Sequence, residues 1–190
     1  MGNGAVNLST TCSYRGAASV EVSLPARSTG GQVEAQLVTN NGSVPTPPTT
    51  WYTRGYFYLP APLQPYSTGL LKVQQSSPPF HGAHLRVAAT GLLEVLNDRD
   101  TPSLTVSAVA FPLDRWVCVE LEVGIGSPAP IRARIDGTLA LDYAQSTVAT
   151  PAFTRFVAGQ IPTVASAASS AWTYYVDDLV VSASPVGCAD

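Results

Sequence analysis

Hydrophobic and polar residues alternate with a period of two along most of the chain, which is the pattern of β-strands with one buried face. Residues 19–24 read Ser-Val-Glu-Val-Ser-Leu, and residues 51–59 are rich in the aromatic types that strands favour. Short runs of Gly, Pro, Asn and Ser separate the alternating segments. The pattern predicts twelve strands, at residues 19–24, 32–38, 51–59, 70–75, 84–89, 92–97, 104–110, 115–123, 131–135, 138–143, 153–158 and 173–182.

The predicted fold is all-β, because no segment of about a dozen residues combines helical periodicity with helix caps. Many short strands with closely spaced turn signals are typical of a two-sheet antiparallel β-sandwich. We expect one domain over residues 1–190, with residues 1–11 as an N-terminal linker and residues 160–171 as a surface loop. No apolar run reaches the roughly 18 residues that a membrane-spanning helix needs.

The segment 51–59 suggests a ligand-binding surface on one strand face. Its odd positions are mostly apolar and are suited to a core, whereas its even positions are Tyr52, Arg54, Tyr56 and Tyr58. A tyrosine combines an apolar ring with a polar tip, so it can be half exposed. Sugars suit such a surface, since their C–H faces stack on rings and their hydroxyls bond to Arg or Tyr.

Charged residues alternate in the same way on two later strands. Glu120 and Glu122 share one face of the strand 115–123, and Arg132 and Arg134 share one face of the strand 131–135. Either these residues form cross-strand ion pairs, or, together with Arg86, they extend the ligand-binding face. The sequence leaves both interpretations open.

The composition narrows the possible partners. Only 12% of the residues are charged, the net charge is −3, and Lys72 is the only lysine. Because there is no basic run, nucleic acid is not an expected partner. The excess of arginine over lysine favours a bacterial source. Residues 1–10 lack the pattern of a signal peptide, so an exported protein would carry that segment outside this chain.

Three segments resemble the concanavalin A-like lectin/glucanase superfamily, in particular its laminin-G-like and polysaccharide-lyase-like jelly rolls. They are Arg-Trp-Val-Cys-Val-Glu-Leu-Glu at 115–122, Ile-Arg-Ala-Arg-Ile-Asp-Gly at 131–137 and Tyr-Tyr-Val-Asp-Asp-Leu-Val-Val-Ser at 174–182. The resemblance implies two curved antiparallel sheets, neighbouring termini and a concave face that receives a glycan. In many members an Asp of the last strand holds a structural calcium, and Asp177 matches that position.

Neighbouring termini would bring Cys12 close to Cys188. The expected disulfide is therefore Cys12–Cys188, which leaves Cys118 as a free buried thiol. The alternative is three unpaired thiols in a reducing compartment, since spacing alone does not fix connectivity.

Catalytic motifs are weak. A retaining glucanase needs two carboxyl groups about 5 Å apart, and Glu120-Leu-Glu122 lacks the acidic residue that the family places between them. Tyr52, Arg54, His84 and Arg86 supply the residue types of a jelly-roll lyase without its motifs. We therefore expect a secreted or cell-surface, non-catalytic domain that binds a polysaccharide or glycan. The alternatives are a divergent polysaccharide lyase or glycosidase, and a structural module that adheres to a cell-surface protein.

Overall fold

The computed structural model describes residues 4–39, 49–75, 81–98, 103–125, 129–145, 153–165 and 167–188, and these residues contain thirteen strands and no helix. Within them no helix is long and apolar enough to cross a membrane. The strands are β1 Ala5–Ser9, β2 Ser19–Leu24, β3 Gln32–Val38, β4 Thr50–Tyr58, β5 Thr68–Gln74, β6 Gly82–Val87, β7 Leu92–Asn97, β8 Ser103–Ala110, β9 Trp116–Gly124, β10 Ala129–Ile135, β11 Thr138–Gln145, β12 Arg155–Val164 and β13 Trp172–Ser182.

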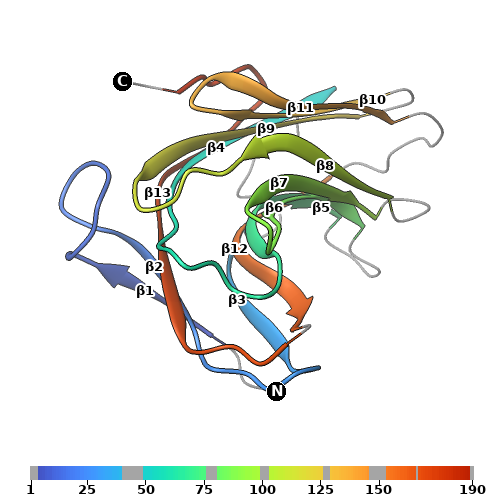
Figure 1. Ribbon diagram of the computed structural model, residues 1–190. Helices are drawn as coiled ribbons and strands as arrows, with labels where there is room; N and C mark the ends of the chain where they lie inside the picture. The colour runs from blue at the N-terminus through green and yellow to red at the C-terminus, as the bar shows by residue number, and fades with distance from the viewer. Residues whose placement is uncertain are drawn as a thin grey trace.

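The strands form two antiparallel sheets, as the sequence predicted. The seven-stranded sheet has the order β1-β2-β13-β4-β9-β10-β11, and the six-stranded sheet has the order β3-β12-β5-β6-β7-β8. The seven-stranded sheet bends around the six-stranded sheet (Figure 1). The face of the six-stranded sheet that is turned away from the core therefore lies on the inner side of the bend. We call it the groove face.

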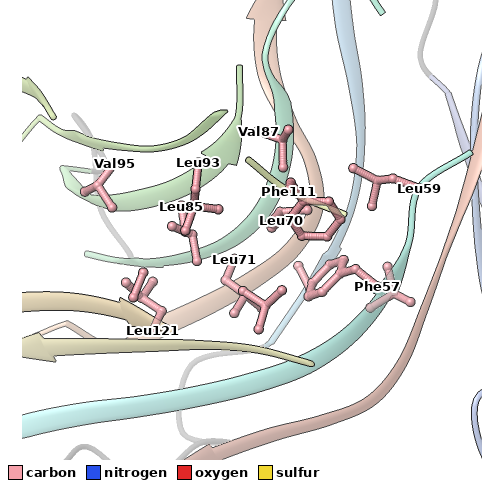
Figure 2. Close-up of a cluster of buried hydrophobic side chains, with 14 of the residues drawn as sticks. Phe57, Leu59, Leu70, Leu71, Leu85, Val87, Leu93, Val95, Phe111 and Leu121 are labelled. Atoms are coloured by element: carbon pink, nitrogen blue, oxygen red, sulfur yellow. The ribbon is translucent and has the colours of Figure 1, made fainter. Parts of the chain in front are cut away.

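The core lies between the two sheets and is built from the apolar half of each alternating strand. In β4, Trp51 and Phe57 point inward and are fully buried, as is Leu59 just beyond the strand end. They meet leucines such as Leu71 and Leu85 from the six-stranded sheet (Figure 2). Burial of each such side chain contributes roughly 1.5–3 kcal/mol, which makes this alternation the main determinant of which face of a strand points inward.

Two segments differ from the prediction. Residues 5–9 form the edge strand β1 instead of a linker, and they pair with β2 from Ala5↔Ser23 to Ser9↔Ser19. This strand is mostly exposed, and Leu8 is 82% accessible. Because neither face of the strand is largely buried, its sequence has no alternation of buried and exposed residue types from which a strand could be predicted.

Strand β12 continues to Val164, so the first part of the expected loop 160–171 is sheet. Its polar Gln160 is fully buried. The burial is tolerated because the side-chain carbonyl accepts a hydrogen bond from the Gly69 amide and the NH₂ group donates to the Ile161 carbonyl. In a sequence, a buried glutamine whose polar groups are all hydrogen-bonded cannot be told from a glutamine of a surface loop. This is why residues 160–164 were predicted as a loop.

Candidate functional site

The groove face carries polar side chains from neighbouring strands. In β5, Leu71 and Val73 belong to the core, so Lys72 and Gln74 point to the groove face. The same alternation in β6 places His84 there, between Ala83 and Leu85 of the core. Three of these polar groups are nearly inaccessible to solvent, with 6% exposure for Lys72 and His84 and 7% for Gln74. Such burial of polar groups is costly unless they are paired, so their partners matter.

Lys72 and His84 lie opposite each other across β5 and β6 and share one carboxylate. Asp98 Oδ2 is 3.1 Å from His84 Nε2 and 3.9 Å from Lys72 Nζ. Burial lowers the pKa of Lys72 to about 8, against the opposing effect of Asp98. Burial also lowers the pKa of His84 below its ordinary value. The Lys72 amine can therefore lose its proton close to neutral pH, whereas His84 favours its neutral form.

Backbone contacts hold Asp98 in place at the end of β7. The Gly82 amide donates to its carboxylate, and the Asp98 amide donates to the Gly82 carbonyl at 3.1 Å. Position 82 requires glycine, because a Cβ atom there would lie 2.1 Å from the Val73 carbonyl oxygen. Burial opposes ionisation of Asp98, but His84, the Gly82 amide and Lys72 together lower its pKa. The carboxylate is thus an ionised, fixed partner for the Lys72 amine and the His84 ring.

A groove of about 330 Å³ opens beside this cluster. Residues of four strands line it, and these are Glu34, Gln36, Val38, Lys72, Gln74, His84, Arg155, Ile161 and Pro162. Arg155 lies opposite Gln74 in register, so a guanidinium group and an amide face the same end of the groove. The lining thus combines hydrogen-bond donors and acceptors, and it contains both acidic and basic side chains.

Arg86 also belongs to the six-stranded sheet, but it is engaged in an ion pair. Its Nη2 lies 2.8 Å from Glu94 Oε1, and the side chains are 15% and 5% exposed. The two residues are in register across β6 and β7. In the sequence-based prediction, Arg86 shares one ligand-binding face with Tyr52, Arg54, Tyr56 and Tyr58. That grouping is wrong, because these four residues belong to β4 of the seven-stranded sheet.

The outer face of the seven-stranded sheet carries the tyrosines of β4, but other segments cover two of the predicted ligand contacts. Tyr56 is 4% exposed, because the Tyr14 ring stacks on it with centroids 3.7 Å apart. Arg54 is 6% exposed, and its Nη2 donates to Asp178 Oδ2 at 2.8 Å. The Tyr14 ring and the Asp178 and Gly187 segments thus occupy the positions from which a ligand would contact these two side chains.

The remaining tyrosines of that strand keep part of their surface. Tyr52 and Tyr58 are half-buried. Tyr58 makes edge contacts with Trp116 and Tyr175, at centroid distances of 5.9 and 6.3 Å. The row therefore does not act as one surface, because Tyr52 is separated from Tyr58 by the two covered positions.

Glu and Arg pair across β9 and β10, which is one of the two interpretations that the sequence left open. Arg132 lies opposite Glu122 with 3.0 Å between Nη1 and Oε1, and Arg134 Nη1 is 3.6 Å from Glu122 Oε2. Glu120 accepts a hydrogen bond from the Gly187 amide at 3.0 Å. The two glutamates are thus engaged by different groups, Glu122 by two arginines and Glu120 by a backbone amide.

The disulfide joins Cys118 to Cys188, with 5.9 Å between their Cα atoms, and Cys12 is a free thiol. The predicted Cys12–Cys188 bridge is wrong. Cys12 lies in the connection between β1 and β2, and β13 and β4 separate those strands from β9, which carries Cys118. Since neighbouring strands are about 4.8 Å apart, Cys188 cannot reach both cysteines.

Asp177, the expected calcium ligand, holds the segment before β2 instead. Its Oδ2 accepts hydrogen bonds from the amides of Tyr14 and Arg15, at 2.8 and 3.1 Å, and its Oδ1 accepts one from Asp178. Amide donors thus point at both oxygens, and the described residues contain no cluster of three or more His, Cys, Asp or Glu side chains. Calcium needs six to eight oxygen ligands, so this donor set does not fit it.

We therefore expect calcium and a chelator to give the same thermal unfolding midpoint. A ligand at 100 times its dissociation constant would add about 2.7 kcal/mol, a shift of roughly 5–10 °C for a chain of this size. Calorimetry with calcium chloride and with EGTA measures the difference, and magnesium chloride is the control for ionic strength. A calcium-specific rise of several degrees would show that Asp177 or another site binds the ion.

Sequence reasoning missed most of the groove. Of its residues only His84 was considered, and it was grouped with Tyr52 and Arg54 of the other sheet. A signal was present, because Lys72 is the only lysine and lies within the apolar run Gly-Leu-Leu-Lys-Val at 69–73. A charged residue there indicates a polar face on an otherwise buried strand.

No known family model matches the sequence, and no curated protein matches it. Solved structures do resemble the fold. The cellulose-induced protein Cip1 matches with a TM-score of 0.76 at 18% identity, over 99% of this chain and 89% of that one. An endo-β-1,4-glucuronan lyase from the fungus Trichoderma reesei gives 0.75 at 11%, over 95% and 87%. The carbohydrate-binding module CBM66 from Bacillus subtilis gives 0.50 at 12%, over 93% and 91%. At these identities the matches show the fold alone, and it is the concanavalin A-like jelly roll.

Proposed function

We propose that the chain binds a polysaccharide along the groove face of the six-stranded sheet and acts outside the cell without cleaving its ligand. The observation that carries this proposal is the row of nearly inaccessible polar side chains, Lys72, Gln74 and His84, at an open groove. These groups have already lost most of their contact with bulk water, so a ligand that bonds to them adds little further desolvation. Small polar sets of this kind in a groove fix the orientation of a ligand.

Two further observations support the proposal. The fold is shared with the carbohydrate-binding module CBM66 and with an endo-β-1,4-glucuronan lyase. A disulfide is compatible with an oxidising compartment outside the cytosol. The fold by itself does not decide the function, so the side chains of the groove carry the argument.

A polysaccharide lyase is the second candidate, and one observation favours it. Lys72 and His84 are both buried beside the groove and their pKa values are lowered. Elimination needs a base that takes the proton next to a uronate carboxyl group and an acid that protonates the departing glycosidic oxygen. An amine with a pKa of about 8, as at Lys72, can act as a base close to neutral pH, and a neutral His84 ring can also accept a proton.

Titration calorimetry of the full chain with β-1,4-glucan oligosaccharides, glucuronan and alginate tests the proposal. We expect Gln74→Ala to weaken binding about fivefold, because one hydrogen bond contributes about 1 kcal/mol. Thr173→Ala, on the outer face of the other sheet, is the control and should bind as the unchanged chain does. Equal affinity for both variants, or no binding to any of these polysaccharides, would contradict the proposed site.

The same samples separate binding from cleavage. Ultraviolet absorbance of the unsaturated uronate product reports a lyase reaction. If product forms, and if His84→Asn stops it while the affinity is retained, the second candidate replaces the first. If the ligand binds and no product appears, the non-catalytic function holds.

A further inference from the structure

The outer face of the seven-stranded sheet contains a second hollow, of about 450 Å³, on the side of the molecule opposite the groove. Its floor is formed by β4, β9 and β10, and one wall is the segment 185–188 that follows β13. The side chains used below are Tyr52, Glu120, Glu122, Arg134 and Asp136. The volume lies within the roughly 300–1,000 Å³ of small-molecule sites.

The wall is fixed by contacts from strands that are distant in sequence. Cys188 is bonded to Cys118 of β9, and the Gly187 amide donates to Glu120 Oε1 at 3.0 Å. Arg54 Nη1 donates to the Gly187 carbonyl at 3.2 Å, and Arg54 is itself held by Asp178. The hollow is therefore formed before any ligand arrives, which reduces the entropy lost on binding.

The floor offers a ring and several oxygen acceptors. Tyr52 lies opposite Glu122 across β4 and β9, and its side chain makes no hydrogen bond or ring contact within the part of the chain that the structure describes. Glu122 is oriented by Arg132 and Arg134, and the Arg134 side chain is 34% exposed. Tyrosine rings stack on the C–H face of a sugar, while carboxylate and guanidinium groups bond to its hydroxyls.

The charges of the lining select between sugar classes. Glu122 and Asp136 are balanced by ion pairs with Arg132, Arg134 and Arg115. The Glu120 carboxylate accepts the Gly187 amide and forms no ion pair within the part of the chain that the structure describes, so a uronate close to it would be repelled. A neutral sugar meets no such repulsion, and its hydroxyls can donate to the carboxylates.

We propose that this hollow is a second carbohydrate site, which binds a neutral sugar unit between Tyr52 and the segment 185–188. Its room suits about one or two sugar rings, not a long chain. It lies on a different sheet from the groove, so it stands independently of the function proposed above.

The test is an NMR titration of the oxidised full chain with methyl glycosides of neutral hexoses, with cellobiose and, for comparison, with glucuronic acid. We expect neutral sugars to shift the amide signals of Tyr52, Glu120 and Gly187, and glucuronic acid to leave them unchanged. Tyr52→Ala should weaken the neutral-sugar affinity at least tenfold. Thr173→Ala, on the outer face of the same sheet but beside β2 and outside the hollow, is the control and should bind these sugars normally.

Specific outcomes would overturn the inference. The hollow is not a sugar site if no neutral sugar shifts these amides, or if Tyr52→Ala binds as the unchanged chain does. The NMR spectrum of Tyr52→Ala itself reports whether the variant is folded. If it is not, Glu122→Gln provides the second variant, and unchanged affinity in that variant has the same meaning. Loss of binding in Lys72→Met alone would assign the sugar to the groove instead.

Discussion

Removal of the Cys118–Cys188 disulfide by the double substitution Cys118→Ala and Cys188→Ser is expected to lower the free energy of unfolding by about 4 kcal/mol. The bridge closes a loop of 70 residues. In the chain-entropy model such a cross-link removes about that much conformational freedom from the unfolded chain. Small domains have only roughly 5–15 kcal/mol of net stability, so this loss is a large part of the total. Urea unfolding followed by tryptophan fluorescence gives the value.

The control is Cys12→Ser, which should change the free energy of unfolding by less than about 0.5 kcal/mol, because Cys12 is unpaired and only partly buried. A large loss in Cys12→Ser with little change in the double variant would favour the Cys12–Cys188 pairing that the sequence suggested. Peptide mass spectrometry under non-reducing conditions identifies the bonded cysteines directly. The double variant should also release segment 185–188 from the outer face, since Cys188 anchors it.

Lys72→Met is expected to make the chain more stable at pH 7 and to weaken polysaccharide binding about 10- to 100-fold. The binding loss follows from the proposed function, because a hydrogen bond to a charged group contributes about 1.5–3 kcal/mol. The stability gain follows from burial, which lowers the pKa of Lys72 from 10.5 to about 8. That shift means that folding disfavours the charged amine. We expect a gain of about 1–2 kcal/mol, below the full value of the shift because Asp98 loses one of its partners in the variant.

The pH dependence of stability distinguishes this cause from others. Between pH 8 and 10.5 the unfolded chain keeps a proton on Lys72 that the folded chain has released. The free energy of unfolding therefore rises with pH across that window. Below pH 8 the folded chain bears the full cost of burying the charged Lys72 amine. Lys72→Met should lose this rise. Urea unfolding at pH 7, 8, 9 and 10 measures the slope, and the difference from the unchanged chain removes the contributions of other titrating groups.

Arg115→Met is the matched control, because it also replaces a cation by methionine. Arg115 pairs with Asp136 at the surface, where the side chains are 51% and 40% exposed, so little stability should change. Identical slopes for Lys72→Met and the unchanged chain would show that the folded and unfolded pKa values of Lys72 are equal. Stabilisation combined with unchanged polysaccharide affinity would refute the role of Lys72 in binding.

These two expected effects of Lys72→Met are connected. A buried cation that costs stability is retained where it serves a function, since stability and activity often oppose each other at binding sites. The Gly82 amide and His84 hold Asp98 beside Lys72, which keeps the cost moderate. In the groove a charged side chain is buried at a cost in stability, and the proposed ligand binding is the reason for that cost.

The strands and their inward faces could be predicted from the sequence. Trp51 and Phe57 are inward because period two is a property of the extended backbone and holds for any strand. The alternation of Glu and Arg left ion pairing open as one of two interpretations, and the structure pairs Glu122 with Arg132. The edge strand β1 was missed because it buries little. The segment from Gln160 was missed because its polar side chain is satisfied internally.

Which outward faces stay open was decided only by the tertiary structure. Tyr56 is covered by Tyr14, and Glu120 is contacted by Gly187, 67 residues away in the sequence. The groove likewise joins Lys72 of β5, His84 of β6 and Asp98, which follows β7. Alternation reports the direction of a side chain relative to its own backbone. It carries no information about which distant segment packs over that side chain, because that depends on contacts made only when both sheets have formed.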